Sequence, residues 1–168
     1  MTTPATAAPA IRASGLRRSF GDTLAEADLD LEVGEGAVFG LLGPDGAGKS
    51  TLIRMLATVL RPDGGEASVF GHSVTREAAL VTPRIGYMSQ RFSMYPDLSV
   101  AENMDFFATI RGVSKADRRT RSASLLEGMG LAEFTKRQAQ HLSGGMKQKL
   151  MLATTLMHEP DLLLLDEP

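Results

Sequence analysis

The sequence has no cysteine, which excludes disulfide bonds and thiolate metal sites and fits a reducing compartment. No uninterrupted apolar run approaches the roughly 20 residues that a membrane-spanning helix needs. The formal net charge of −2 gives no support to a general nucleic-acid or membrane-surface role. The start of the chain lacks the basic and apolar regions of a secretory signal, and we expect 1–10 to be a flexible leader. These absences predict a cytoplasmic protein without a nucleic-acid partner.

What is present indicates one globular domain of mixed α/β structure. The 168 residues are 43% hydrophobic and 23% charged, which is typical of a chain that folds around a core. Apolar and acidic residues alternate over 27–33, as in a half-buried strand. The run 37–42 is almost wholly apolar, as in a strand covered on both faces. Residues 66–71 and 84–89 predict further strands, and 162–165 predicts the last one.

Helical periodicity dominates the rest of the chain. Residues 51–60 carry apolar side chains at helical spacing, and a segment with proline and glycine ends that helix. Residues 99–102 form a capping-box pattern at the start of a second helix. Residues 114–117 predict another start of this kind, with Gly130 as its stop. We therefore expect a helical insertion, from about 99 to 158, in an α/β fold.

The stretch GPDGAGKS, at 43–50, fits the pattern G-x-x-x-x-G-K-[ST] in full. It lies between an apolar run and a helical segment, where glycines let backbone N–H groups cradle phosphates at a helix N-terminus. Lys49 would contact the β- and γ-phosphates, and the Ser50 hydroxyl would bind Mg²⁺. A glycine-rich turn that contains GKS by coincidence is the alternative, which the spacing and the context disfavour. The predicted nucleotide-binding residues of this loop are Gly43, Pro44, Asp45, Gly46, Ala47, Gly48, Lys49, Ser50 and Thr51.

The last eight residues, DLLLLDEP, predict a buried strand that delivers two carboxylates to a site. Asp166 would hold Mg²⁺ through water, and Glu167 would polarise the attacking water as a catalytic residue. Taken alone, the stretch is equally an apolar strand that closes in an acidic turn. Together with the phosphate loop, it favours the second half of a nucleotide site.

The stretch HLSGGMKQKL predicts a helix with Ser143 as its N-cap. Gly144 and Gly145 would permit the close approach of another group to that helix N-terminus. By itself, this pattern is typical of any glycine turn that begins a helix.

Together these motifs resemble the ATP-binding subunit of ABC transporters, and the resemblance covers 11–168. LSGGM matches the family's signature loop, GYMSQ supplies its Q-loop glutamine as Gln90, and DLLLLDEP matches its Walker B strand. Phe20 falls where the family places an aromatic that stacks on adenine; a core or hairpin aromatic is the alternative. The resemblance implies a P-loop NTPase fold with an N-terminal antiparallel β part, a parallel core sheet and a helical subdomain at about 95–142.

The resemblance also implies how the remaining motif residues act. In this family, the signature residues contact the γ-phosphate of ATP bound to a second subunit. Ser143, Gly144 and Gly145 would have that role, in a homodimer or a tandem of ATP-binding domains. Gln90 would sense the γ-phosphate and Mg²⁺, as both a catalytic and a metal-site residue.

A membrane permease subunit is the second implied partner, and it would hold the protein at the inner face of the cell membrane. Met94, Tyr95 and Leu98 would either face this permease or pack within the helical subdomain. The stretches GYMSQRFSMYPDLSVAEN and LSGGMKQKL are similar to ABC-2 type exporters, which move drugs or other hydrophobic molecules. Asp45 stands where the family usually has asparagine, and its charge would weaken ATP binding unless it points outward.

The expected function is therefore ATP hydrolysis, with Mg²⁺ as cofactor, that drives export through a separate permease. A non-transport ABC-type ATPase is one alternative. A truncated, non-hydrolysing ATP-binding or interaction fragment is another.

In this family, the chain continues past the Walker B strand with a further core strand and a switch histidine. His72, His141 and His158 all precede the Walker B strand, so we expect surface or packing roles for them. We expect a longer natural protein, with the 168-residue chain inactive alone. The further strand would lie between 37–42 and 162–165, and both lose a neighbour without it.

Overall fold

The computed structural model describes residues 9–20 and 23–168, with side chains described outside 23–27. Residues 1–8, most of the predicted leader, lie outside the described residues. Ala10 is buried, and its carbonyl accepts a hydrogen bond of 2.8 Å from the Phe70 N–H. The chain divides into two compact units, a first unit Met1–Thr82 and a second unit Pro83–Pro168.

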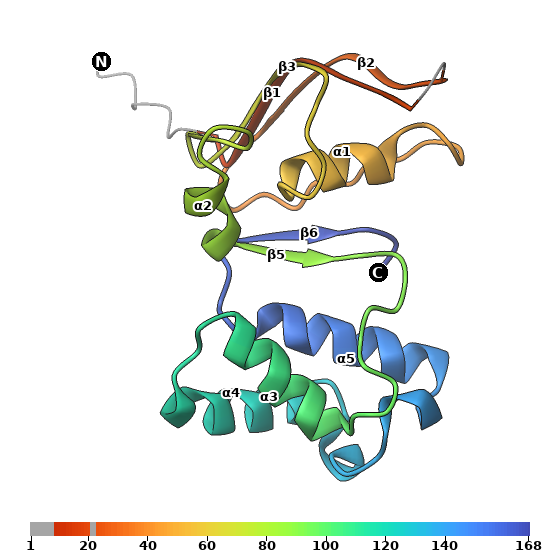
Figure 1. The fold of residues 1–168 in the computed structure, drawn as a ribbon, viewed down its shortest axis with the longest axis vertical. Helices are drawn as coiled ribbons and strands as arrows, with labels where there is room; N and C mark the ends of the chain where they lie inside the picture. The colour runs from red at the N-terminus through yellow and green to blue at the C-terminus, as the bar shows by residue number, and fades with distance from the viewer. Residues whose placement is uncertain (1–8, 21–22) are drawn as a thin grey trace. The chain divides into compact units, whose positions relative to one another are not determined.

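The first unit contains a four-stranded antiparallel sheet in the order β2-β1-β3-β4 (Figure 1). Its strands are β1 Ile11–Phe20, β2 Thr23–Val33, β3 Gly64–Val69 and β4 His72–Ser73. The strands predicted at 27–33 and 66–71 are confirmed, as is the antiparallel part of the fold. Over 28–33, the part of β2 whose side chains are described, the apolar side chains are less exposed than the acidic ones between them, as their alternation predicts.

Strand β1 was not predicted, because a bulge interrupts the alternation of buried and exposed side chains along it. Ile11 and Ala13 are buried, and the next buried side chain is Leu16. Gly15 has φ of 55°, and the pairing with β2 shifts register at this place. A Cβ added at Gly65 in β3 would lie 2.1 Å from the Gly15 carbonyl oxygen, so the bulge also requires a glycine in the neighbouring strand.

Helix α1, Lys49–Leu56, packs against this sheet (Figure 1). It confirms the predicted helix but ends before residue 60. Thr58 adopts φ of 62°, and the next two N–H groups turn back to the Arg54 carbonyl. A left-handed residue at this place terminates an α-helix. The chain continues, after β4, with α2 Ala78–Val81 and the 3₁₀ helix η1 Thr82–Arg84.

The strand predicted at 37–42 is wrong, because this segment has no regular secondary structure. Val38 and Leu42 are almost fully exposed, and Phe39 is 53% exposed. A strand forms where a neighbour pairs with its backbone N–H and C=O groups. Among the described residues, no strand pairs with this segment. Its apolar composition is suited to burial, but composition alone does not supply the sheet partner.

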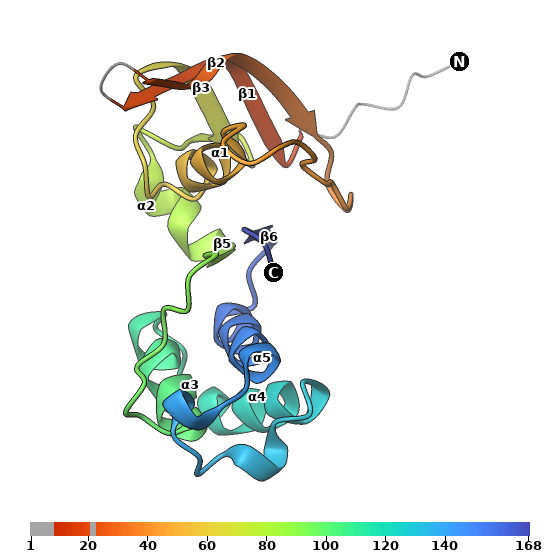
Figure 2. The ribbon, with the colours of Figure 1, turned by 90° about the vertical axis from the view of Figure 1, so that its right-hand side faces the viewer.

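In the second unit, β5 Ile85–Met88 and β6 Leu162–Leu165 form a two-stranded parallel sheet (Figure 1), which Figure 2 shows nearly end-on. Both confirm predicted strands. The register pairs the first residue of β5 with the first of β6, and the last with the last. A Cβ added at Gly86 would lie 2.8 Å from side-chain atoms of Leu163 and Thr155, so glycine permits the close packing of this sheet.

Helices form most of the second unit as the structure describes it. They are α3 Val100–Ile110, α4 Lys115–Gly128 and α5 Gly144–Leu156, with the 3₁₀ helices η2 Ala132–Phe134 and η3 Ala139–His141. The capping box of α3 is confirmed, because Ser99 and Glu102 each accept from the other's backbone N–H. Ser114 caps α4 as predicted, and Gly130 follows that helix with φ of 68°.

The core of the second unit is rich in methionine, an unbranched side chain that fills irregular gaps. Its buried residues are Met88, Met94, Val100, Met104, Ala108, Val113, Leu126, Leu131, Ala139, Leu142, Leu150, Met151, Ala153 and Met157. Helix α5 shares this core, and the subdomain boundaries at about 95 and 142 stay predictions. Over the described ranges, no helix combines the length and the hydropathy that crossing a bilayer takes.

Candidate nucleotide site

The phosphate-loop residues form an exposed turn that leads into α1. Gly46 and Gly48 have φ of 79° and 86°, a backbone conformation that residues with a Cβ rarely adopt. The Ala47 N–H donates to the Pro44 carbonyl at 3.2 Å and closes the turn. Because the N-cap is Gly48, no side chain of its own caps the first turn of α1. That helix end therefore presents its positive dipole to an anion.

Lys49 folds back over the loop that precedes it. Its Nζ donates to the carbonyl oxygens of Gly43 at 2.8 Å and Pro44 at 2.7 Å. An ammonium group has three donors, so in the described part of the chain these two carbonyls leave one for a phosphate oxygen. The loop thus holds its cation in place and keeps the positive charge at the start of α1.

The remaining loop residues are accessible. Asp45 is exposed to solvent, where water screens its charge. Ser50 and Thr51 lie in the first turn of α1 and are half-buried. The structure therefore brings all the predicted residues of 43–51 into one exposed turn and helix start.

Phe20 ends strand β1 at the hairpin to β2. Its side chain is 49% exposed, which excludes the core alternative. The Arg18 guanidinium carbon lies 5.0 Å from the Phe20 ring centroid, within the range of a cation–π contact. The ring is therefore a supported but accessible aromatic surface.

In the second unit, strand register brings two site residues together. Gln90 lies two residues beyond the end of β5, and Glu167 lies two residues beyond the end of β6. The Asp166 N–H donates to the Met88 carbonyl at 3.0 Å, so the pairing continues past the strands. Gln90 Nε2 then donates to Glu167 Oε2 at 2.7 Å, although the two residues are 77 positions apart.

Asp166 and Glu167 have different surroundings although they are adjacent. Asp166 is buried, with 2% exposure, whereas Glu167 is exposed. Glu167 has φ of 52°, in the left-handed region, which costs a residue with a Cβ about 1–2 kcal/mol. The pair therefore offers one carboxylate in the interior and one that water can reach.

The three residues predicted to hold Mg²⁺ lie in different units, and each has a side chain of a kind that suits this ion. Ser50, Gln90 and Asp166 carry hydroxyl, amide and carboxylate oxygens, which Mg²⁺ prefers over nitrogen and sulfur. Over the described residues, no group of three His, Cys, Asp or Glu side chains is arranged to hold a metal. That agrees with Mg²⁺ sites in general, which use one or two protein carboxylates and complete the shell with waters and substrate phosphates.

The signature motif begins helix α5 as predicted. The Ser143 Oγ accepts from the Met146 N–H at 3.3 Å. Gly144 and Gly145 are exposed, and a Cβ added at either would meet no atom within 4 Å. Packing within the described chain therefore does not require these glycines, and the space beside them is open to a ligand.

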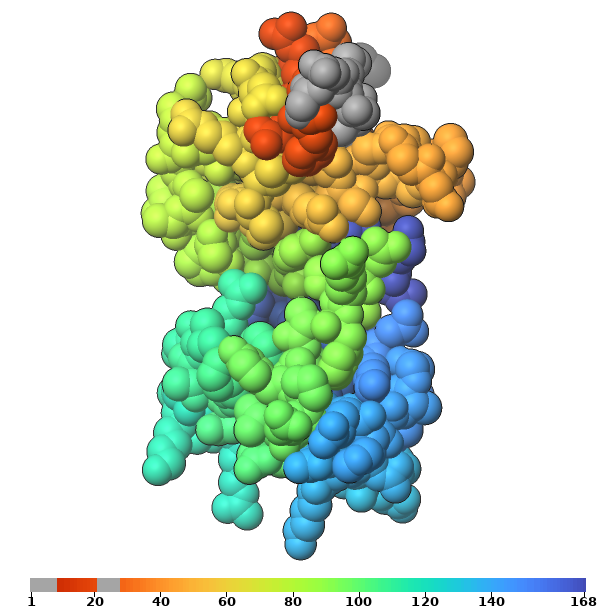
Figure 3. Space-filling view, turned by 45° about the vertical axis from the view of Figure 1, so that its right-hand side comes forward, coloured from red at the N-terminus to blue at the C-terminus, as the bar shows by residue number. Residues whose placement is uncertain are grey.

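The segment before the signature is hydrogen-bonded to the segment after Gln90. Four backbone hydrogen bonds of 2.9 Å join residues 96–101 to residues 135–140. Two donors, Ala139 and Gln140, lie in one segment, and two, Val100 and Ala101, lie in the other. Figure 3 shows these segments, green and blue, against each other at the surface of the second unit.

Asn103 is a residue that the sequence analysis missed. Its side chain is fully buried; Oδ1 accepts from the Tyr95 N–H at 2.9 Å. Its Nδ2 donates to the carbonyls of Tyr95, Leu98 and Ser99 at 3.0 to 3.1 Å. A buried amide with its hydrogen bonds satisfied fixes the loop at 95–99. The available signal was a polar residue within the apolar stripe of a predicted helix.

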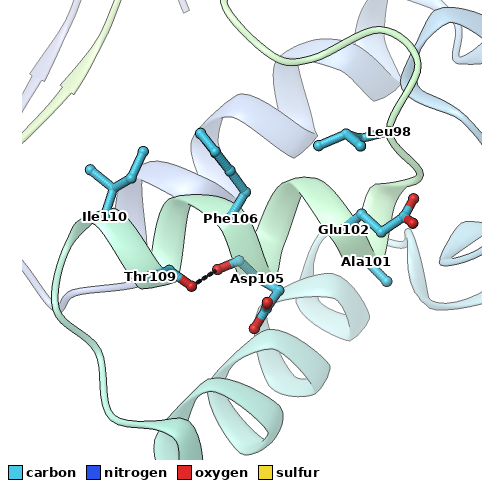
Figure 4. A pocket seen from close by; sticks show the side chains of 7 residues that line it. All are labelled: Leu98, Ala101, Glu102, Asp105, Phe106, Thr109 and Ile110. Carbon is cyan, nitrogen blue, oxygen red and sulfur yellow. Dashed lines mark hydrogen bonds between the residues drawn. The ribbon is translucent and has the colours of Figure 1, made fainter.

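A groove of about 470 Å³ follows one face of α3 (Figure 4). It is lined by Leu98, Ala101, Glu102, Asp105, Phe106, Thr109 and Ile110. Met94 is buried in the methionine-rich core, so the packing alternative holds for it. Tyr95 is 48% exposed, and its ring meets the Phe106 ring edge-on at 4.6 Å. Tyr95 and Leu98 therefore belong to an accessible surface.

Two of the three histidines make side-chain contacts, and the third is at the surface. His72 Nδ1 lies 3.6 Å from Glu77 Oε1, and His141 is exposed in η3. His158 Nε2 donates to the Ile85 carbonyl at 2.9 Å, which ties the end of α5 to strand β5.

A glycine-rich loop that opens a helix, with acidic residues directly after a parallel strand, defines the P-loop class of nucleotide-binding α/β proteins. The family profile described as "ABC transporter" matches residues 27–168. The chain therefore belongs to the ABC transporter family and carries its ATP-binding domain.

Relatives with this domain are named for drug resistance or export. The chain is 49% identical over 160 residues to the probable multidrug ABC transporter ATP-binding protein YbhF of Escherichia coli (strain K12), covering 94% of this chain and 28% of that protein. It is 48% identical over 159 residues to the daunorubicin/doxorubicin resistance ATP-binding protein DrrA of Streptomyces peucetius, covering 95% of this chain and 48% of that protein. The chain thus spans about half or less of these relatives' length.

A solved structure confirms the fold. That of cbiO1 from Clostridium perfringens, described as part of the ABC transporter complex cbiONQ, gives a TM-score of 0.81 at 25% identity. The superposition covers 96% of this chain and 66% of the other.

Proposed function

We propose that the intact protein binds and hydrolyses ATP and so powers export of a hydrophobic or drug-like substrate through a separate membrane permease. The observation that carries this proposal is the phosphate loop, where Gly46, Gly48, Lys49 and a helix N-terminus meet in one exposed turn. Membership of the family supports hydrolysis. Likeness to proteins named for drug resistance supports export.

Binding depends on the first unit. Backbone N–H groups at the start of α1 and the Lys49 ammonium hold the phosphates, and their preorganised positive charge favours the charge that develops during transfer. Phe20 stacks on the adenine ring. These groups position the nucleotide without supplying a base.

Hydrolysis depends on the second unit. Glu167 accepts a proton from the water that attacks the γ-phosphorus, and ADP leaves as the bond to the γ-phosphorus breaks. Gln90 donates to the Glu167 carboxylate at 2.7 Å and so orients this base. Gln90 and Asp166, together with Ser50 of the first unit, would supply the oxygens that hold Mg²⁺. When bound, this ion neutralises charge on the β- and γ-phosphate oxygens.

The open space at Gly144 and Gly145 supports a second ATP-binding domain as partner. We infer that Ser143 and these glycines contact the γ-phosphate of a nucleotide held by that domain. The active form is then a homodimer or a tandem.

The groove along α3 supports a permease as the other partner. Its apolar side chains, with the exposed ring of Tyr95 that packs edge-on against the half-buried ring of Phe106, suit a partner helix that buries apolar residues. Docking here holds the protein at the inner face of the membrane. The hydrogen bonds between 96–101 and 135–140 connect this surface to the segment before Ser143.

Affinity purification of the intact protein from detergent-solubilised membranes tests the transport proposal. An integral membrane permease is expected to co-purify, and Ile110→Asp in the groove should release it while the Kd for ATP stays unchanged. Leu80→Asp is the matched control, because Leu80 is also an exposed apolar residue but lies in α2. Retention of ribosomes without any membrane protein would contradict the proposal.

A further inference from the structure

Arg18 and Phe20 lie two residues apart near the end of β1, where the pairing with β2 shifts register between Arg18 and Ser19. The guanidinium carbon of Arg18 lies 5.0 Å from the centroid of the Phe20 ring. One side of the ring therefore rests on a cation, and about half of the side chain stays exposed.

The Arg18 side chain is fixed from the other direction by the loop after α1. Its Nη1 donates to Asp63 Oδ1 and, at 3.2 Å, to the Arg61 carbonyl. The second oxygen of Asp63 accepts from the Ser19 N–H at 2.8 Å. The Asp63 N–H donates to the Arg17 carbonyl at 2.9 Å. Asp63 thus joins this loop to three consecutive residues of β1.

Charge supports the same arrangement. The Ser19 N–H, and then the Arg18 guanidinium, lower the pKa of the Asp63 carboxyl, so this group is ionised throughout the neutral range. The Arg18 side chain is 25% exposed, so water screens the pair only in part. A planar guanidinium can hold a carboxylate with its N–H groups and cover a ring with its face, which an ammonium cannot do.

We propose that Arg18, held by Asp63, is a positioning residue that fixes the Phe20 ring as a platform for adenine. The guanidinium covers one face of the ring, and the base stacks on the other. A ring that is ordered before binding loses less conformational entropy when the base arrives. This inference rests on the proposed contact between Phe20 and ATP.

Affinities of the intact protein for two ligands test the proposal. One ligand is ATP, and the other is inorganic tripolyphosphate, which has no base. Phe20→Ala is expected to weaken ATP by roughly 5- to 150-fold, the range for losing a base–aromatic stack. Arg18→Leu and Asp63→Asn should each weaken ATP by about 2- to 5-fold through loss of the cation–π support. The affinity for tripolyphosphate should not change in any of these variants, because this ligand has no base to stack on the ring.

The variants separate positioning from structure. Asp63→Asn should have no further effect on ATP affinity in a Phe20→Ala background, because the ring through which it acts is gone. Arg18→Lys should behave like Arg18→Leu. Arg12→Leu is the matched control, since Arg12 lies on the same strand and pairs with Glu32 instead. It should leave ATP affinity unchanged.

A spectroscopic measurement provides a second readout, because the sequence contains no tryptophan. Phe20→Trp introduces an indole at this position, and its fluorescence anisotropy, with the emission of the unmodified protein subtracted, reports the mobility of that ring. In the absence of ATP, adding Asp63→Asn should lower the anisotropy because the ring becomes more mobile, whereas adding Arg12→Leu should not change it.

Three results would overturn the inference, and they differ in what else they overturn. Unchanged ATP affinity in Phe20→Ala would contradict the adenine contact itself. If Phe20→Ala loses ATP affinity but Arg18→Leu and Asp63→Asn do not, the adenine contact stands and only the positioning role of Arg18 is contradicted. If the Arg18 and Asp63 variants lose affinity for ATP and for tripolyphosphate equally, the contact between Asp63 and Arg18 has only a structural role.

Discussion

The two units of the chain hold their functional groups by different means. In the first unit, backbone conformation positions most of the functional groups, because positive φ at Gly46 and Gly48 and a helix N-terminus shape the phosphate loop. In the second unit, contacts between side chains position them. Parallel register places Gln90 beside Glu167, and a buried Asn103 fixes the loop at 95–99.

Because of this difference, the two units should tolerate different amino-acid substitutions. Where the backbone shapes the site, a glycine cannot be replaced without strain, whereas a neighbouring exposed side chain can be. Where register places side chains, as at Gln90 and Glu167, the side chain itself cannot be replaced without loss of the hydrogen bond that it makes. Variants in the two units should therefore fail in different ways, and their comparison tests that expectation.

The largest effect is expected at the end of β6. In the intact protein, Glu167→Gln removes the proposed general base but keeps the shape of the side chain. Hydrolysis, measured as phosphate release, should fall by about 10²- to 10⁴-fold, while the Kd for ATP stays near that of the unmodified protein. Glu159→Gln is the control, because Glu159 pairs with Arg121 at 2.9 Å on the same unit. An unchanged rate in Glu167→Gln would refute its catalytic role.

The first unit should fail at binding instead. Lys49→Ala removes a charged donor from the phosphates, and ATP affinity should fall by about 100-fold. Isothermal titration calorimetry measures this directly. Arg54→Ala, on the exposed face of the same helix, should bind ATP normally. Normal binding by Lys49→Ala would show that another group holds the phosphates.

Backbone packing in the first unit can be tested without a nucleotide. Gly65→Ala places a Cβ 2.1 Å from the Gly15 carbonyl, so the strands must separate. We expect a loss of about 2 kcal/mol in the free energy of unfolding, measured by urea denaturation. Gly71→Ala, with φ of 80° but no atom within 4 Å, should cost about 1 kcal/mol through backbone strain alone. Equal losses would mean that the close approach is unimportant.

The sequence predicts the features that depend on the local order of residues. The phosphate loop, the N-caps at Ser99, Ser114 and Ser143, and the strands β2, β3, β5 and β6 depend on local residue order, and the sequence predicts them. Strand β1 was missed because the Gly15 bulge breaks its alternation. The segment 37–42 was predicted as a strand because composition reports hydrophobicity but says nothing of a pairing partner.

Contacts between distant residues were beyond local patterns. The Gln90–Glu167 hydrogen bond and the ladder between 96–101 and 135–140 arise from tertiary packing. The hydrogen bond from Arg18 to Asp63 joins strand β1 to the loop after α1, and the two residues are 45 positions apart. Nothing in the order of residues near either one indicates the other.

The smallest effect is a pH dependence of the second unit. Burial lowers the pKa of His158, the positive charge of Arg111 adds to this, and the hydrogen bond to the Ile85 carbonyl opposes it. Because the folded pKa lies below the unfolded value of about 6.5, the unfolded chain binds a proton more readily. Stability is therefore full above that pH and falls as the pH drops toward the folded pKa.

Urea midpoints of the intact protein at pH 7.5 and pH 5.5 measure this dependence. We expect a change of only a fraction of a kcal/mol, since solvent screens a half-exposed group. His158→Gln should reduce the change, and His141→Gln, an exposed position in η3, should not. A larger pH effect in His158→Gln would contradict the assignment.

We propose that Lys49 and Glu167 act on the same ATP. Retention of nucleotide tests it most directly: the intact protein is incubated with Mg²⁺ and ATP, freed of unbound nucleotide, and its content is separated into ATP and ADP. Glu167→Gln should retain unhydrolysed ATP, and Lys49→Ala/Glu167→Gln should retain none. If the double variant keeps as much ATP as Glu167→Gln alone, the two residues do not serve one nucleotide, and the account is wrong.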